Sequence, residues 1–341
     1  MLQCKGRNIP NPKYKVIQNH NDKKISDPDK VIRDIDDEWI RSQRSRKNTV
    51  DPYRPYALNI EKERTSSGSI EEIITIFLTN KECPFTCLMC DLWKNTTDKK
   101  VPTGAIPEQI EWALSQLPPA RLIKLYNSGN FFDAQAIPKE DYQEISYLLQ
   151  DFETVIVESH PRLINDKVLQ FRDMLGAELQ VAIGLETVHP EVVSKLNKRM
   201  RLADFKRSVE FLNKHDIKSR AFILLRPPFL NEIEGIEWAR KSIDYAFECG
   251  VECCVIIPTR SGNGALDILQ KEGHFSPPDI KSLEEVLDYG IGLRSGLVFA
   301  DLWDIDLFST CMKCLEERKI RLENTNLNQR LQPAVFCSCL K

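Results

Sequence analysis

Cys83, Cys87 and Cys90 form a C-x3-C-x2-C pattern in the segment NKECPFTCLMCDLW, residues 80–93. Three thiolates are an incomplete ligand set for a closed metal site. A structural zinc ion takes four protein ligands, and a closed cubane cluster takes four cysteines. Three thiolates can instead hold three irons of a [4Fe–4S] cluster and leave the fourth iron open to a small molecule. A zinc ion completed by a distant ligand, or reduced structural cysteines, are the alternatives.

A second group of cysteines lies near the carboxyl terminus. Cys311 and Cys314 form one close pair, and Cys337 and Cys339 form another after a gap of 22 residues. Two such pairs fit a closed tetrahedral site, so we expect either zinc or an auxiliary [4Fe–4S] cluster. Four unligated thiols are the alternative. The remaining cysteines lack such pairing; Cys249, Cys253 and Cys254 have the pattern of small buried apolar residues.

The chain from residue 73 alternates short apolar, β-branched runs with segments of helical periodicity. This alternation predicts about six strand–helix units and therefore an α/β fold with a parallel sheet. Six units are too few for a full eight-unit barrel, so we expect a partial (βα)6 barrel. The predicted strands are 73–79, 121–127, 154–159, 179–185, 219–225 and 252–259, and the predicted helices are 107–117, 139–150, 164–175, 202–215 and 234–250.

Polar residues follow these predicted strands, at the edge where parallel α/β proteins place their sites. The candidates after the second to fifth strands are Ser128, Gly129 and Asn130; Glu158, Ser159 and His160; Gly184 and Glu186; and Arg226.

The sequence predicts three regions: a segment before the strand–helix array, the array itself and a segment after it. Residues 1–65 form a polar N-terminal flank, residues 66–265 form the partial barrel, and residues 266–341 form an extension with the Cys4 metal site. Within the flank, residues 27–47 predict a helix with Asp27 or a neighbour near its cap.

Composition is that of an ordinary globular protein, with 42% apolar residues, 28% charged residues and a net charge of −3 among 341 residues. No uncharged apolar run is long enough to span a bilayer, and the first residues lack a secretory signal. Eleven cysteines without an export signal indicate reduced thiols and metal ligation, with the cytoplasm as the expected location. The basic stretches at residues 41–47 and 197–207 would suit phosphate contacts, although charge runs are commonly solvated faces.

The cysteine spacing, its position after the first strand and the six-unit barrel resemble the radical S-adenosylmethionine (radical SAM) superfamily. The resemblance implies a [4Fe–4S] cluster whose open iron is chelated by SAM, with reductive release of a 5′-deoxyadenosyl radical. Two positions depart from the family pattern: Met89 replaces an aromatic residue before the third cysteine, and Asn130 replaces the acid of a Gly-Gly-Glu-like turn. The SAM contacts that the resemblance implies are Met89, Ser128, Gly129, Asn130, Glu158, Ser159, Glu186 and Arg226.

Within the superfamily, GLETVHPEVVSKLNKRM, residues 184–200, resembles the subgroup with an elongator-like core. Together with NSGNFFD and the carboxyl-terminal cysteines, the chain looks most like the radical SAM subunit of archaeosine synthase and its uncharacterised bacterial relatives. That likeness implies a tRNA nucleoside as substrate and an electron donor such as flavodoxin or ferredoxin. A radical SAM enzyme acting on a small molecule or peptide, and a non-enzymatic iron–sulfur or zinc module, are the competing hypotheses.

Overall fold

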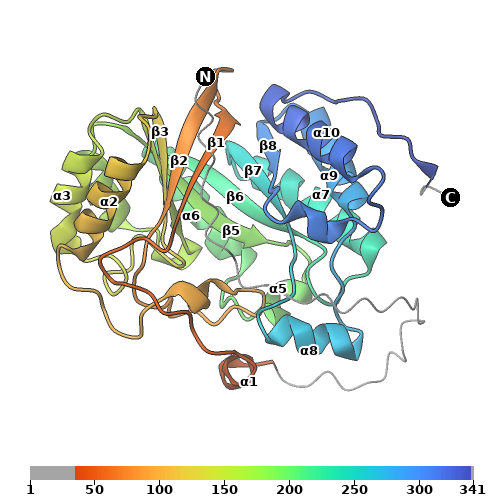
Figure 1. Cartoon of the computed structure of the whole chain (residues 1–341), viewed down its shortest axis with the longest axis horizontal. Helices are drawn as coiled ribbons and strands as arrows, with labels where there is room; N and C mark the ends of the chain where they lie inside the picture. Colours follow the sequence, from red (N-terminus) through yellow and green to blue (C-terminus); the bar gives the residue numbers. More distant parts are fainter. Residues whose placement is uncertain (1–34, 339–341) are drawn as a thin grey trace. The chain divides into compact units, whose positions relative to one another are not determined.

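The computed structural model describes residues 35–338 of the chain. The described strands form one open sheet in the order β1 to β8, and Figure 1 shows helices packed against it. β1 is antiparallel to β2, and every later neighbouring pair is parallel. The strands are β1 (Ala57–Arg64), β2 (Ile70–Phe77), β3 (Leu122–Tyr126), β4 (Thr154–Ser159), β5 (Glu178–Glu186), β6 (Lys218–Leu225), β7 (Cys253–Pro258) and β8 (Leu297–Ala300).

Helices connect the parallel strands. The α-helices are α1 (Asp37–Ser42), α2 (Ala105–Gln116), α3 (Tyr142–Leu148), α4 (Asp166–Met174), α5 (Val192–Lys195), α6 (Leu202–Lys214), α7 (Glu232–Glu248), α8 (Ala265–Glu272), α9 (Ile280–Leu293) and α10 (Leu315–Asn328). Short 3-10 helices are η1 (Leu92–Asn95), η2 (Lys139–Asp141), η3 (Pro161–Leu163) and η4 (Ile305–Phe308). The longest helix, α7, starts with a reciprocal capping box between Asn231 and Glu234.

The predicted α/β partial barrel is confirmed, and all six predicted strands are present as β2 to β7. The sequence analysis missed β1 and β8. β1 is an edge strand with mostly half-buried or exposed residues, so it lacks an apolar run, and β8 has only four residues. The described residues 35–338 belong to one compact unit. The boundaries proposed at residues 65 and 265 stay a prediction.

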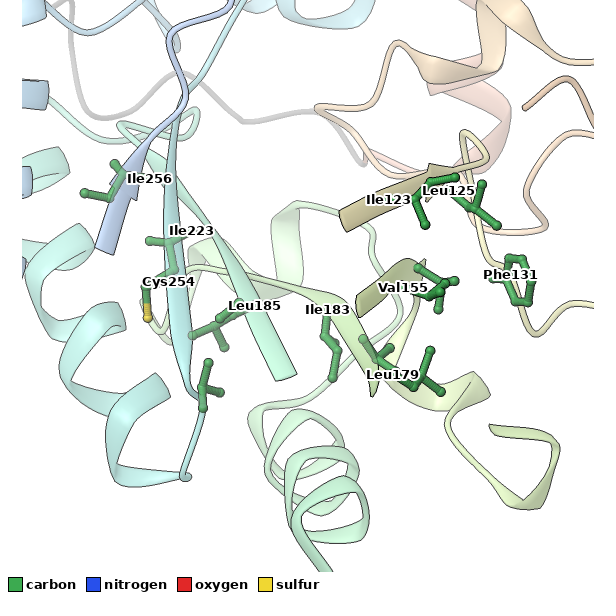
Figure 2. Close-up of a cluster of buried hydrophobic side chains, with 14 of the residues drawn as sticks. Ile123, Leu125, Phe131, Val155, Leu179, Ile183, Leu185, Ile223, Cys254 and Ile256 are labelled. Atoms are coloured by element: carbon green, nitrogen blue, oxygen red, sulfur yellow. The ribbon is translucent and has the colours of Figure 1, made fainter. Parts of the chain in front are cut away.

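The main hydrophobic core lies between the sheet and its outer helices. Figure 2 shows alternate residues of successive strands contributing to it, including Ile123 and Leu125 of β3, Val155 of β4, and Ile223 of β6. These side chains are fully buried, as the outward face of a parallel sheet covered by helices requires. The core thus explains why the strands read as nearly continuous apolar runs.

The concave face of the sheet has a different composition. A small apolar layer contains Ile73, Ile156 and Ala182. Beside it, the buried carboxylate of Glu63 on β1 accepts bonds from Lys124 (2.7 Å) and from the guanidinium of Arg220. Burial alone would raise the pKa of Glu63, but the charges of Arg220 and Lys124 hold it well below its usual range. This ion cluster ties edge strand β1 to β3 and β6.

The other edge of the sheet is covered by α10. The side-chain amide of Asn326 accepts from Ala300 N–H and donates to Ala300 C=O, both at 2.9 Å. Gln329 does the same for Val298, at 2.9 and 2.8 Å. These amides pair the free backbone groups of β8 as another strand would, which protects the exposed edge. Arg64 of β1 also donates to Leu327 C=O (3.3 Å), so α10 contacts both edge strands.

The helix predicted over residues 27–47 is much shorter in the described part of the chain. α1 spans Asp37–Ser42, and its N-cap is Asp36, whose side chain accepts from Trp39 N–H. A continuous helix over residues 27–47 was wrong, because residues 35–36 and 44–47 are not helical; the cap predicted at Asp27 is not tested. Residues 27–34 lie outside the described residues.

Replacing Arg220 tests the ion cluster. Arg220→Met removes one of two cations from a buried carboxylate, and breaking a buried pair costs about 3 kcal/mol or more of unfolding free energy. Arg121→Met is the control, because Arg121 is 57% exposed where it pairs with Glu153 and Glu71, and surface pairs contribute less than about 1 kcal/mol each. Urea denaturation of both variants measures the difference. Equal losses would show that the buried cluster is no more stabilising than a surface pair.

Candidate active site

The three cysteines lie on a loop that follows β2, the cysteine loop (residues 80–98). A parallel bridge between Lys81 and Thr97 closes the base of this loop. Leu88 anchors it, being fully buried in an apolar cluster with residues of α1 and α8. Figure 1 shows α1, η1, α5 and α8 gathered at one edge of the sheet. Cys83, Cys87 and Cys90 are therefore held where the parallel strands end.

Burial controls the protonation of these thiols. It raises the pKa of Cys83 to about 11, that of Cys87 to about 12, and that of Cys90 well above its ordinary value. Alone, the three groups are neutral thiols at pH 7. A metal cluster binds thiolates and supplies the positive charge that stabilises them, so binding would release protons. This partly enclosed, three-sulfur donor set fits the cluster that the resemblance implies.

The spacing of the sulfurs disfavours the single-ion alternative. Among the described residues, the group whose ligand atoms all lie within 4.8 Å of one another is formed by Cys311, Cys314 and Cys337. Cys83, Cys87 and Cys90 do not form such a group. A single zinc ion draws its sulfurs to about 2.3 Å from one centre. Wider spacing suits a cluster of several irons.

The turn after β3 connects the cysteine loop to β4. Asn130 donates from Nδ2 to Cys83 Sγ (3.1 Å) and accepts at Oδ1 from His160 N–H (2.6 Å). Gly129 packs so closely that an added Cβ would lie 3.3 Å from Cys83 Cβ. Asn130 is one of the SAM contacts that the resemblance implies. In this structure its side chain is engaged with Cys83 and His160, and the SAM contact stays a prediction.

Glu158, at the end of β4, holds this turn. Its Oε1 accepts from Asn127 N–H (2.7 Å) and Gly129 N–H (3.2 Å). Burial raises the pKa of Glu158 to about 7, although these backbone N–H groups act to lower it. The Glu158 carboxyl group thus binds the backbone of the turn after β3, and its raised pKa lies close to neutral pH.

His160 and Lys198 form a second clamp on the cysteine loop. The His160 ring stacks on Phe85, with centroids 3.8 Å apart, and its Nε2 donates to Lys198 C=O (2.9 Å). Burial lowers the pKa of His160 to about 3, so the ring is neutral. Next to Lys198, Leu196 C=O accepts from Leu88 N–H (2.9 Å). The segment 196–199 therefore lies against the cysteine loop.

Glu186 ends β5 next to a bulge in the sheet. Its carboxylate is paired with the buried ammonium group of Lys198, which also donates to Gly184 C=O (2.6 Å). A Cβ on Gly184 would lie 2.0 Å from Lys198 Nζ, so only glycine leaves room for this contact. The predicted contact between Glu186 and the ribose of SAM stays a prediction. It requires the Glu186 carboxylate either to leave Lys198 or to bind Lys198 and the ribose at the same time.

Three predicted site residues share an unusual backbone conformation. Ser128, Glu186 and Arg226, which end or follow β3, β5 and β6, have φ of +52°, +66° and +53°. Side chains other than glycine rarely adopt this region, and such strain is concentrated at functional sites. We interpret the repeated strain as a property of the edge that carries the cysteine loop.

The remaining predicted contacts are placed in different surroundings. Ser128 Oγ donates to Tyr56 Oη (2.8 Å), and Ser159 is buried with a long contact to His160 C=O (3.5 Å). Arg226 forms an ion pair with Glu232 at the start of α7. Met89 packs against two apolar clusters, one of them around α8. A SAM contact for each of these residues stays a prediction.

Sequence reasoning missed two residues that position the loop. Lys198 lies within a stretch interpreted as phosphate-binding, and nothing in its sequence context signals a buried pair with Glu186. Asn263, after β7, donates to Leu88 C=O (2.7 Å) and Cys90 C=O (3.3 Å). Its only signal is its place in a glycine-rich turn after a strand. The other basic stretch also serves the loop, because Arg44 and Lys47 both pair with Glu82.

A basic groove lies next to these elements. Its lining includes five basic side chains and two acidic ones, in a space of about 1050 Å³. The basic residues are Arg162, Arg199, Arg201, Arg207 and Lys214. Arg199 is paired with Asp37, and Arg207 and Arg201 share Asp204, although the Arg201 side chain is 85% exposed. The groove therefore has excess positive charge in a chain whose net charge is −3.

The carboxyl-terminal cysteines are also brought together. Cys311, Cys314 and Cys337 form the close group noted above. Cys339, the predicted fourth member, lies outside the described residues, as does Cys4. Cys253 and Cys254 are fully buried, as expected, and Cys249 is half-buried.

Comparison with known proteins gives distant relatives. No protein-family model matches the chain. An uncharacterized protein of Methanocaldococcus jannaschii is 24% identical over 91% of this chain and 92% of that protein. Archaeosine synthase subunit beta of Thermococcus kodakarensis is 28% identical over 59% of this chain, and the subunit of Methanosarcina acetivorans is 25% identical over a similar share. The chain spans 65% and 60% of the lengths of these two subunits.

Among solved structures, methylornithine synthase matches with a TM-score of 0.50 and 14% identity, over 75% of this chain and 70% of that one. This likeness shows a shared fold. The findings together confirm the predicted resemblance to the radical SAM superfamily, a class of enzymes. Within that class, the chain is similar over 59% of its length to archaeosine synthase subunit beta. Of the described helices, none has the length and apolarity needed to cross a membrane.

Glu158 makes a pH-dependent prediction. Its pKa is raised to about 7 from an ordinary 4.5, so the folded state binds more protons in this interval, and stability falls as pH rises through it. Glu158→Gln keeps an acceptor oxygen but cannot ionise. The unfolding free energy of the wild type minus that of the variant should fall by about 2–3 kcal/mol from pH 4.5 to above pH 7. The exposed Glu153→Gln is the control, and a flat difference for both would contradict the assignment.

Proposed function

We propose that the chain is a radical SAM enzyme that cleaves SAM at a cluster on Cys83, Cys87 and Cys90 and modifies a nucleoside in tRNA. The observation that carries the first part is the placement of three thiols, on one partly enclosed loop, at the carboxyl edge of a parallel sheet. When bound, a [4Fe–4S] cluster with SAM supplies one-electron cleavage of the sulfonium, which releases methionine and a 5′-deoxyadenosyl radical.

The chain's own residues have three tasks in this proposal. Asn130 donates to the sulfur of Cys83, which orients it and offsets negative charge on a thiolate. The His160 ring stacks on Phe85 of the loop, and Asn263 donates to the loop carbonyl groups of Leu88 and Cys90. Glu186 and Lys198 provide an acceptor and a cation that together suit the hydroxyl and carboxylate groups of SAM.

The tRNA substrate is supported by different observations. The two relatives named archaeosine synthase subunit beta are related to this chain over 59% of its length, and archaeosine is a modified nucleoside. The basic groove lies beside η3 and α6, next to the segment 196–199 that contacts the cysteine loop. Excess positive charge there would attract phosphate groups and raise the encounter rate with RNA.

An electron donor such as flavodoxin or ferredoxin and a cytoplasmic location complete the proposal. The competing substrate classes are a small molecule and a peptide, which would need no phosphate-binding surface. The non-enzymatic module is the outcome if SAM is not cleaved.

Removing one loop cysteine tests the cluster. Oxygen-free reconstitution of Cys87→Ala should lower the iron content and abolish reductive formation of 5′-deoxyadenosine, because two thiolates cannot retain the cluster. Cys249→Ala, a half-buried cysteine outside both groups, should keep both properties. Chromatography of the reaction products and iron analysis provide the readouts. Wild-type protein that binds iron but forms no 5′-deoxyadenosine would support the non-enzymatic module.

Salt dependence tests the RNA contact. Filter binding to total tRNA should weaken as salt rises, with a log–log slope proportional to the number of phosphate contacts. Arg201→Ala/Arg207→Ala should reduce this slope by up to about 2, roughly one for each lost contact. Lys62→Ala/Lys271→Ala removes the same charge from exposed sites outside the groove and should leave the slope unchanged.

Equal slope changes in both double variants would show that net charge, not the groove, attracts RNA. No binding by the wild type at low salt, together with unchanged modified nucleosides in a deletion strain, would favour a small molecule or peptide.

A further inference from the structure

The carboxyl-terminal cysteine group has the dimensions of a single-ion site. Cys311 Sγ and Cys337 Sγ lie 3.8 Å apart, and the sulfurs of Cys311, Cys314 and Cys337 are all within 4.8 Å of one another. For a zinc–sulfur bond of about 2.3 Å, tetrahedral geometry separates two ligand sulfurs by about 3.8 Å. A [4Fe–4S] cluster spreads its cysteines around four irons and therefore needs wider spacing.

We propose that this group binds one zinc ion in a closed thiolate site, not an auxiliary cluster. The sequence predicts Cys339 as the fourth ligand. Each coordinated thiol releases its proton to solvent, so the site binds as a thiolate set. With the three described cysteines and the predicted Cys339 as ligands, no position would stay open, and the role would be structural and separate from the proposed SAM chemistry.

A buried arginine supports the assignment. Arg318, which is 3% exposed, donates from Nε to Cys314 Sγ (3.3 Å) and pairs with the buried Glu284 of α9. A cation that donates to a sulfur stabilises the thiolate form and orients the ligand. Cys314 is also the N-cap of the long helix α10, where the helix dipole favours negative charge.

The terminal segment is already held in place for ligation. Arg321 donates to Pro333 C=O (2.9 Å) and Gln332 C=O (3.1 Å), and Arg318 donates to Val335 C=O (3.4 Å). These bonds fix the backbone two residues before Cys337. Because α10 covers the edge of β8, a zinc ion here would fasten the terminal segment to the helix that protects this edge of the sheet.

The test starts from Cys83→Ala/Cys87→Ala/Cys90→Ala, which removes the first cysteine set from the full chain. Metal analysis of this variant should find about one zinc per chain and no iron. Replacement of zinc by cobalt should produce the intense visible bands of a tetrahedral thiolate site. Adding Cys311→Ser should lower the zinc content at least tenfold, whereas adding Cys249→Ser should not.

Arg318→Gln should weaken zinc binding by about 10- to 100-fold in competition with a chelator. Arg240→Gln is the control and should leave zinc binding unchanged, since Arg240 pairs with Glu285 of the same helix α9 and is not among the residues that hold the terminal segment. Iron and sulfide in place of zinc would overturn the proposal. A metal-free chain would also overturn the proposal. A thiol titration that finds two thiols fewer than expected would then indicate a disulfide, and one that finds all of them would indicate unligated cysteines. The metal content and cobalt spectrum of the starting variant decide the matter even if Cys311→Ser fails to fold.

Discussion

The enclosure of three thiols on one irregular loop is the constraint on which the site depends. The cysteine loop has little regular structure, since η1 is only four residues long. Its backbone polar groups must therefore be paired by other elements. Asn263 after β7 and the segment 196–199 after α5 supply such partners, and the His160 ring after β4 stacks on Phe85 of the loop. The loop is held from several strand ends at once, which only a parallel sheet brings to one edge.

The same edge stores strain, and its polar contacts are shared. Asn130 serves both Cys83 and His160, and Lys198 serves both Glu186 and Gly184. A disturbance at one strand end therefore reaches its neighbours through a bond that both use. The positive φ of Glu186 is maintained because this network outweighs a backbone cost of about 1–3 kcal/mol.

The two edge strands of the sheet, β1 and β8, are held in different ways. β1 is tied across the concave face by the buried carboxylate of Glu63, while β8 is satisfied by side-chain amides of α10. An open sheet leaves its edge strands with unpaired backbone groups. The amides of α10 pair those of β8, whereas the Glu63 cluster fixes the position of β1 through side chains. The carboxyl-terminal cysteines belong to this arrangement, because Cys311 and Cys314 immediately precede α10.

The sequence by itself determined β2 to β7, most of the helices between them and the position of the cysteine loop. These depend on local apolar periodicity and on spacing along the chain, which a reader of the sequence can see. The tertiary structure decided what spacing does not encode: that Lys198 pairs with Glu186, that Asn263 holds Cys90, and that β1 and β8 complete the sheet. A buried charge or an edge strand gains its role from partners far along the chain, so its own sequence context carries no signal of it.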